Sequence, residues 1–113
     1  MRGVKSGISR LKKRAEFLAV AGRGRKYARG ALLVQALPQQ GSLRLGFTAT
    51  KKLGNAVIRN RAKRRMRAAA RLELPTVTGH DIVLVAREAI RDNSFAALRA
   101  DLRAALDKLG VPR

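Results

Sequence analysis

The chain has 113 residues, 46% of them hydrophobic, and no cysteine, so it can form one domain with a modest core but no disulfide framework. No apolar run approaches the ~18 residues of a membrane-spanning helix. The basic start is followed only by the short apolar patch FLAVA, which disfavours a cleaved signal peptide. We therefore expect a single cytoplasmic domain over residues 1–113, without a membrane partner.

The formal net charge of +19 is unevenly distributed along the chain. Residues 1–71 carry 20 Lys or Arg and one acid, Glu16, whereas residues 72–113 carry six residues of each sign. Self-repulsion of this size destabilises a compact protein and is typical of proteins whose usual partner is a polyanion. Nucleic acid is the first candidate partner, an anionic membrane surface is the second, and a solvated basic surface is the third.

The first half of the chain predicts one helix and two strands. A flexible basic arm at about residues 1–10 precedes LKKRAEFLAVAGRG, which predicts a short helix that ends at Gly22 and Gly24. Residues 29–37 predict a strand ended by Pro38, and PQQGS predicts a turn into a second strand, SLRLGFTAT. Residues of the second strand point alternately to the two faces, and we expect the two strands to form a hairpin.

The second half predicts two helices and one buried strand. A basic helix from Asn55 to about Leu72 precedes HDIVLVAR, a continuous apolar run rich in β-branched residues, which favours a strand inside the sheet. A last helix is predicted to begin with Asn93 or Ser94 as N-cap and to end at Gly110. This order favours an α+β fold in which helices cover a small mixed sheet, and the strands flanking the basic helix could pair in parallel through it.

The basic helix is predicted to have an apolar side and a basic side. At about 100° per residue, the packing side holds Ile58, Ala62, Met66, Ala69 and Leu72. The opposite side holds Arg59, Asn60, Lys63, Arg64, Arg67 and Arg71, with Arg61 and Arg65 flanking the apolar stripe. Guanidinium groups can make paired hydrogen bonds to phosphate oxygens. The lack of acids disfavours a merely solvated helix, and the alanine-rich apolar side disfavours a membrane-surface helix.

The segment KKLGNAVIRNRAKRRMRAAAR, residues 51–71, resembles the RNR motif of the protein subunit of bacterial ribonuclease P. The matching positions are Lys51, Lys52, 54–57, 59–61, Lys63, Arg64 and Arg67. LKKRAEF, the apolar strands and DIVLVAR also fit, so the resemblance covers nearly the whole chain. It implies an αβββαβα sandwich with a left-handed crossover through the basic helix, a fold also found in a ribosomal protein domain.

The resemblance also implies a function and its partners. Members of this family assist a catalytic ribonuclease P RNA in removing the 5′ leader from precursor tRNA, so the implied partner is RNA and not DNA. The Mg²⁺ ions of such an endonuclease would be bound mainly by the RNA subunit. Contacts to that RNA are implied for Arg59, Asn60, Arg61, Lys63, Arg64 and Arg67, and the basic side of the helix adds Arg71.

Phe17 and the face of the central sheet are implied to receive the single-stranded leader. Members often carry a second aromatic residue one turn after Phe17, where Ala21 stands here, and another on the first long strand, which is also missing. Leader contacts would then fall to Phe17, Tyr27, Lys51 and Lys52. The residue pattern alone favours Phe17 as a core residue, and both interpretations stay open.

The acidic residues do not form the pattern of a metal-dependent nuclease. Seven acids are scattered along the chain, with Asp81 expected at a strand edge and Asp101 on the exposed side of the last helix, and the lone His80 offers no zinc site. We therefore predict no catalytic residue and no metal ligand in the protein itself. A stand-alone RNA-binding protein, such as a small ribosomal protein, is the alternative, because it would account equally well for the charge.

Overall fold

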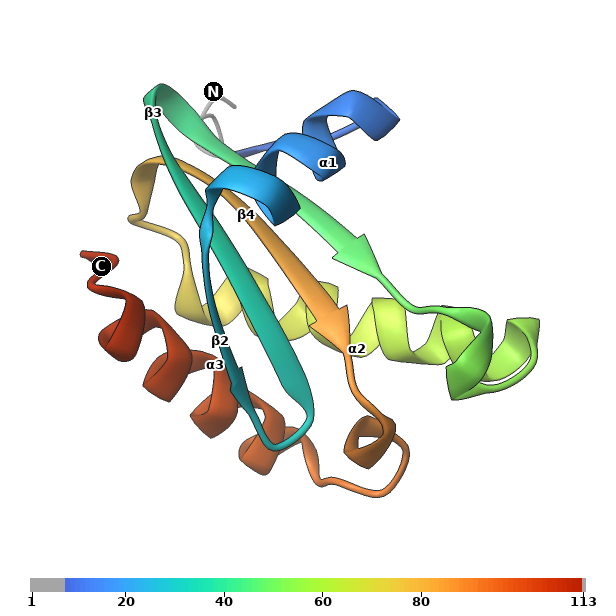
Figure 1. The fold of residues 1–113 in the computed structure, drawn as a ribbon. Helices are drawn as coiled ribbons and strands as arrows, with labels where there is room; N and C mark the ends of the chain where they lie inside the picture. Colours follow the sequence, from blue (N-terminus) through green and yellow to red (C-terminus); the bar gives the residue numbers. More distant parts are fainter. Residues whose placement is uncertain (1–7, 113) are drawn as a thin grey trace, which may run out of the picture.

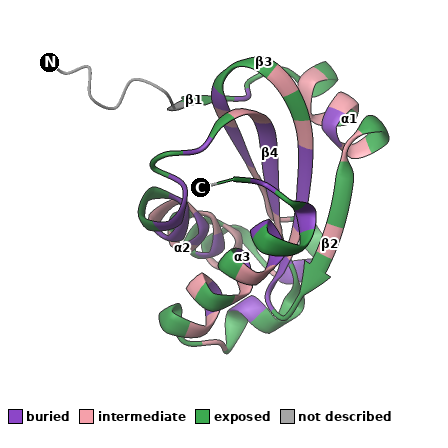
Figure 2. Cartoon of the chain, turned by 90° about the vertical axis from the view of Figure 1, so that its left-hand side faces the viewer, coloured by how far each residue is buried: buried purple, intermediate pink, exposed green. Residues whose placement is uncertain are grey.

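A mixed sheet lies between helix α1 on one face and helices α2 and α3 on the other (Figures 1 and 2). The computed structural model describes residues 8–112. The strands are β1 (Ile8–Arg10), β2 (Arg25–Arg29), β3 (Leu32–Thr48) and β4 (Thr78–Ala86). The helices are α1 (Arg14–Arg23), α2 (Ala56–Glu73) and α3 (Phe95–Leu109), with short 3₁₀ turns η2 (Lys51–Leu53) and η3 (Glu88–Arg91). The predicted α+β sandwich is confirmed.

Strand β3 bends and pairs with both edges of β4. Its first arm, residues 32–38, runs antiparallel to β4. In its second arm, residues 44–48, Arg44 lies opposite Asp81 and the numbers of the paired residues rise together from there. The second arm therefore runs in the same direction as β4, as the arrows in Figure 1 show. The strand predicted to lie inside the sheet is indeed its centre.

The predicted hairpin is wrong, because β4 lies between the two arms. The first predicted strand also began too early. The chain forms β2, turns at Gly30, whose φ is 54°, and only then enters β3. A positive φ of this size favours glycine, so the turn had a local signal. The arms do not pair with each other because β4, an apolar run, needs a strand at each edge.

Helix α2 carries the chain from the second arm of β3 to β4 behind the sheet (Figure 1). The two strands it joins are parallel, which confirms the pairing through the basic helix. The crossover is left-handed, as the resemblance implies. Parallel strands are otherwise joined almost always by right-handed connections.

The main core lies between the sheet and the pair α2 and α3. Helix α2 buries Ala62, Met66 and Ala69 as predicted, but Leu72 is 52% exposed and Glu73 is buried instead. At about 100° per residue, Glu73 lies in the middle of the residues that α2 buries and Leu72 lies at their border. Arg99 and Arg103 of α3 donate to the carboxylate of Glu73 at 2.7 and 2.9 Å, so its buried charge is paired.

The N-terminal segment is partly a strand. Residues 8–10 pair in parallel with the second arm of β3, so this part of the predicted flexible arm is wrong, and residues 1–7 lie outside the described part. A smaller cluster under α1 contains Leu11, Val20 and Val83. Within residues 8–112, no helix combines the length and the apolar character needed to cross a membrane.

Candidate RNA interface

The start of α2 is fixed by a glycine and a cap. Gly54 has a φ of 152°, and a Cβ there would lie 2.8 Å from Cδ1 of Ile58. Only glycine fits such a position without strain. The Oδ1 of Asn55 then accepts a hydrogen bond from the backbone N–H of Ile58 at 3.0 Å, which caps the helix. These two residues set the direction of the helix and therefore the placement of its basic side.

The basic side of α2 faces solvent. Asn60, Arg61, Arg64 and Arg71 are exposed, and Arg59, Lys63 and Arg67 are half-buried along its borders. The guanidinium of Arg59 donates to the carbonyl of Gly54 at 3.2 Å, at the start of the helix. The structure thus brings all the sequence-predicted RNA-subunit contacts onto one helix.

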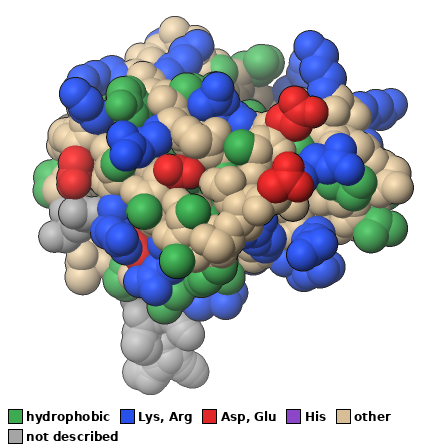
Figure 3. All heavy atoms as spheres, turned by 90° about the horizontal axis from the view of Figure 1, so that it is seen from below, with side chains coloured by type: hydrophobic (Ala, Val, Ile, Leu, Met, Phe, Trp, Pro, Cys, Tyr) green, Lys and Arg blue, Asp and Glu red, His purple; other side chains and the backbone are tan. Residues whose placement is uncertain are grey.

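Most acidic side chains are engaged elsewhere. Among residues 8–112, the structure has the ion pairs Arg29–Asp101, Arg44–Glu16, Arg44–Asp81, Arg99–Glu73 and Arg103–Glu73. These five ion pairs use no cation of α2. In Figure 3, blue Lys and Arg side chains are spread over the face seen from below, with few acids dispersed among them. The positive charge of α2 is therefore not neutralised by these ion pairs, and it is available to a polyanion.

Arg65 is the exception among the cations of α2, because it turns inward. Its guanidinium donates to the backbone carbonyl of Ile90 and, at 2.7 Å, to that of Asn93. Burial, followed by the nearby charge of Arg61, lowers the pKa of Arg65. Arg65 therefore fastens the η3 turn to α2. The sequence placed it beside the apolar stripe but gave no signal for this role.

Phe17 lies on α1 and contacts the opposite face of the sheet. It is half-buried and packs against the small cluster of Leu11, Val20 and Val83. A Cβ on Gly46 would lie 2.5 Å from Cε1 of Phe17, so the ring rests directly on the strand backbone. The ring thus has both a packing contact and a partly exposed surface.

Tyr27 does not join Phe17, although the sequence grouped them. Tyr27 pairs with Val34 and packs against the main core, on the α2 and α3 face of the sheet. Lys51 and Lys52 are exposed in η2, directly after the second arm of β3. Side chains of a strand point alternately to the two faces of the sheet, so the position of Tyr27 in β2 determines its face. Because β2 was not predicted from the sequence, the face on which Tyr27 lies was not predicted either.

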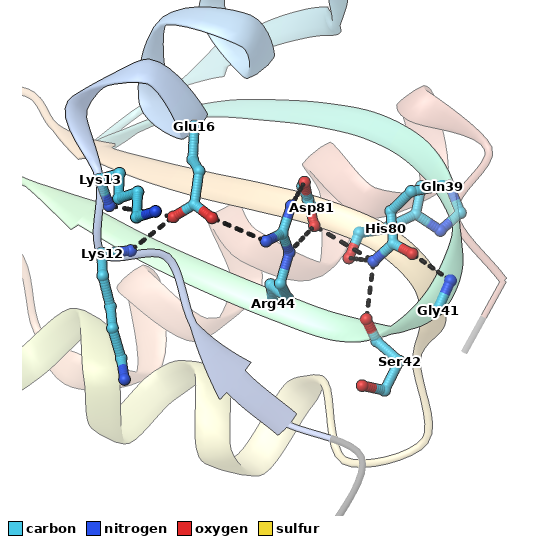
Figure 4. Close-up of polar contacts among 9 residues, drawn as sticks. All are labelled: Lys12, Lys13, Glu16, Gln39, Gly41, Ser42, Arg44, His80 and Asp81. Carbon is cyan, nitrogen blue, oxygen red and sulfur yellow. Dashed lines mark hydrogen bonds and ion pairs between the residues drawn. The ribbon is translucent and has the colours of Figure 1, made fainter.

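A polar network ties α1 to the sheet, and Figure 4 shows Arg44 between Glu16 of α1 and Asp81 of β4. Arg44 donates to Glu16 at 2.8 Å and to both carboxylate oxygens of Asp81 at 2.8 and 2.6 Å. Gln39, in the bend of β3, donates to Asp81 at 3.1 Å. The network fixes the first turn of α1, which also carries Phe17.

Sequence reasoning missed this network, although one signal was present. Glu16 is the only acid among the first 71 residues, and a lone acid in a basic segment indicates a specific partner. Its carboxylate accepts hydrogen bonds from the backbone N–H groups of Lys12 and Lys13 at 2.8 and 3.0 Å. These N–H groups, Lys13 first, and the charge of Arg44 lower the pKa of Glu16. The bonds to Asp81 raise the pKa of Arg44.

The acids do not gather into a metal site within residues 8–112. Asp81 is not at a strand edge as expected, because it lies on the central strand with its side chain 6% exposed. Asp101 is likewise only 15% exposed and accepts from the backbone N–H of Ala31 at 3.0 Å. These two carboxylates have structural partners, so neither is arranged to hold a catalytic ion.

Comparison with known proteins decides the family. The ribonuclease P family profile matches residues 7–110. The chain belongs to the bacterial ribonuclease P protein family. The ribonuclease P protein component of Gluconacetobacter diazotrophicus is 54% identical over 107 residues, covering 90% of this chain and 91% of that protein. The component of Ruegeria pomeroyi is 48% identical, covering 96% and 91%.

Solved structures of ribonuclease P proteins share the fold. The Staphylococcus aureus RNase P protein superimposes with a TM-score of 0.80 at 30% identity, covering 90% of this chain and 95% of that one. The Thermotoga maritima RNase P protein gives a TM-score of 0.74 at 27% identity, covering 89% and 94%. The chain therefore has the fold that its resemblance to the ribonuclease P protein family implied, and it shares this fold with both solved structures.

We predict a pH-dependent contribution of Glu16 to stability. The folded-state pKa of Glu16 lies below its ordinary value of 4.5, so its carboxylate stabilises the protein above that pH and loses the effect as pH falls through the folded-state value. Glu16→Gln should lower the free energy of unfolding near neutral pH, and the difference from wild type should shrink below pH 4.5. Urea unfolding across pH measures this. Glu88→Gln, at an exposed residue of η3, is the control, and a pH-independent difference for Glu16→Gln would contradict the assignment.

Proposed function

We propose that this chain is the protein component of a bacterial ribonuclease P, which assists a catalytic RNA in removing the 5′ leader from precursor tRNA. The observation that carries the proposal is the basic side of α2, which presents the RNR motif to solvent, while none of the five ion pairs uses a cation of this helix. The protein would act in the cytoplasm, where precursor tRNA is processed.

The basic side of α2 is the proposed site for the RNA subunit. The contributing residues are Arg59, Asn60, Arg61, Lys63, Arg64, Arg67 and Arg71. Guanidinium groups on a rigid helix can bind successive backbone phosphates in pairs of hydrogen bonds, which positions the protein without reading sequence. Arg65 is left out of this set, because its donors are used inside the protein.

The chemistry of cleavage is assigned to the RNA. The described residues hold no group of acids that could bind a metal ion, and Asp81 and Asp101 have structural partners. The Mg²⁺ ions of the reaction would therefore be bound mainly by the RNA subunit. The protein contributes binding energy and neutralises phosphate charge.

The leader is proposed to bind on the α1 face of the sheet. Phe17 offers the exposed part of its ring, and the sheet beside it is only half covered, because Leu33, Thr48 and Val85 are half-buried. Lys51 and Lys52 follow the second arm of β3 and can bind leader phosphates. Tyr27 has no part in this site, because it lies on the other face of the sheet.

The stand-alone alternative has less support. A small ribosomal protein would explain the charge but not the match over residues 7–110 to the ribonuclease P family. The relatives and structural neighbours named above are ribonuclease P proteins.

Reconstitution tests the function. The purified chain is combined with a bacterial ribonuclease P RNA at low Mg²⁺, and cleavage of precursor tRNA is measured with and without the protein. We expect cleavage to require the RNA, to increase with the protein and to be absent with protein alone. Cleavage by an RNA-free preparation that is abolished by changing one acid would overturn the assignment of chemistry to the RNA.

Charge removal on α2 should act on affinity for the RNA subunit. Arg61 is exposed, so Arg61→Ala removes a phosphate contact without removing a core residue. We expect weaker binding and a log–log salt dependence flattened by about one unit. Filter binding across salt concentrations measures both quantities. Lys108→Ala removes an exposed cation of α3 and should leave the slope unchanged; equal slopes for all three proteins would remove Arg61 from the interface.

Phe17 should contribute to precursor binding through the leader. On the scale of base–aromatic stacking, ~1 to 3 kcal/mol, and with Ala21 unable to supply a second ring, Phe17→Ala should weaken precursor affinity roughly fivefold to thirtyfold. Mature tRNA, which lacks the leader, should bind the holoenzyme as before. Because Phe17 also packs against Val20, thermal unfolding accompanies the binding assays. A large stability loss with equal losses for both tRNAs would leave only a core role for Phe17.

A further inference from the structure

A groove opens beside α2 where β1 and the second arm of β3 meet the helix. It has a volume of about 300 Å³ and is lined by Ser9, Arg10, Leu45, Phe47, Arg67 and Arg71. These residues come from three elements that are distant in the sequence. The register of β1 against β3 places Arg10 opposite Leu45 and so fixes the outer wall.

The lining combines an apolar floor with a basic rim. Leu45 is 5% exposed and Phe47 is half-buried, and both pack into the main core, so the floor is rigid. Arg10 and Arg71 are exposed, and none of the lining residues is acidic. A nucleobase with attached phosphates fits such a surface better than an acidic peptide, because the aromatic face of the base can stack on the ring in the floor.

Arg67 joins the floor to the rim. Its guanidinium lies 5.6 Å from the centre of the Phe47 ring, a cation–π distance. Its Nε is buried and has no acceptor among the residues that the structure describes. A buried donor without an acceptor is costly and rare in folded proteins. An acceptor supplied by a ligand, such as a phosphate or a base carbonyl oxygen, would satisfy it.

We propose that this groove binds one unpaired nucleotide of the RNA subunit, with the base on Phe47 and Arg67 and its phosphates on Arg10 and Arg71. The inference rests on the proposed function and extends the interface from α2 to β1. The occupant is the RNA subunit and not the leader, because Phe47 packs on the main-core face of the sheet, whereas Phe17 lies on the α1 face. Phe47 and Arg10 are thus further RNA-binding residues.

Phe47→Leu tests the base contact. Leucine keeps an apolar floor but removes the ring, so affinity for the RNA subunit should fall about fivefold to thirtyfold, on the scale of base–aromatic stacking, with an unchanged salt slope. Phe95→Leu removes another partly exposed ring, at the start of α3, and should bind as wild type. Discrimination between precursor and mature tRNA should be unchanged, because the leader site is on the other face.

Arg10→Gln is a second variant, at an exposed position where the core is untouched. It should flatten the log–log salt dependence by about 0.7, the value for one phosphate contact to a single strand. Lys108→Gln is its control. If wild-type protein binds the RNA subunit but both Phe47→Leu and Arg10→Gln bind equally well, the groove proposal fails while the proposed function stands. If wild-type protein fails to bind or stimulate the RNA, the proposed function itself fails.

A direct probe is NMR of the chain with a short single-stranded oligouridine. The Arg67 Nε–H and the Phe47 ring protons of the wild-type protein should shift together. The Arg67 Nε–H of Phe47→Leu, and both sets of resonances of Arg10→Gln, should respond more weakly or not at all. Inorganic phosphate is the comparison ligand. Equal shifts with inorganic phosphate alone would show an anion site without base contact and would overturn the nucleotide assignment.

Discussion

Strand β4 must be buried on both faces and paired at both edges, and the rest of the structure depends on this constraint. Ile82 and Leu84 face the main core, whereas Val83 faces the cluster under α1. A strand that is apolar on both sides needs helices on both sides. The two arms of β3 supply its edges, and α2 must then carry the chain along one face of the sheet. The basic side of α2 points to solvent because its other side covers β4.

The electrostatics of folding and of binding are separated in space. Acidic residues pair with arginines that join elements: Glu16 and Asp81 with Arg44, and Glu73 with two arginines of α3. No cation of α2 takes part in these ion pairs, and Arg65 instead donates to backbone carbonyls. An RNA partner can therefore neutralise the other cations of α2 without competing against contacts that hold the fold together.

Local sequence signals predicted the helices well and the sheet incompletely. Ser94 caps the last helix as expected, Asn55 lies at the start of the basic helix, where it is the N-cap, and Gly110 ends the last helix with a φ of 71°. Strand pairing was harder, because two partners of β3, β1 and β4, lie far away in the sequence and no local pattern shows which edges meet. The five-residue strand β2 is almost entirely exposed, so it lacks the apolar alternation that identifies a strand.

The candidate site was also predicted only in part: the helix was identified from the sequence, but the residues that act through tertiary contacts were not. The RNR motif identified the family and the helix that is proposed to bind RNA, because its residue types and spacing are specific. Residues that act through tertiary contacts could not be recognised in the sequence. Arg65 is one of many basic residues there, and only the structure shows its backbone acceptors. Phe47 is one of several apolar residues in a predicted strand, and only the structure shows its contact with Arg67. Leu72 shows the converse error: it lies at the border of the apolar side of α2, and apolar type alone did not reveal that the charged Glu73 is buried there instead.

The placement of β4 between the two arms of β3 also determines the order in which the chain can fold during synthesis. The first arm of β3 can pair with β2 as soon as both have left the ribosome, but its other edge stays open until residues 78–86 have been made. One edge of the second arm likewise stays unpaired until residues 78–86 have been made. An unpaired apolar edge is where nascent chains associate wrongly. The segment synthesised during this interval contains α2, and the like charges of this helix repel those of another copy of the chain.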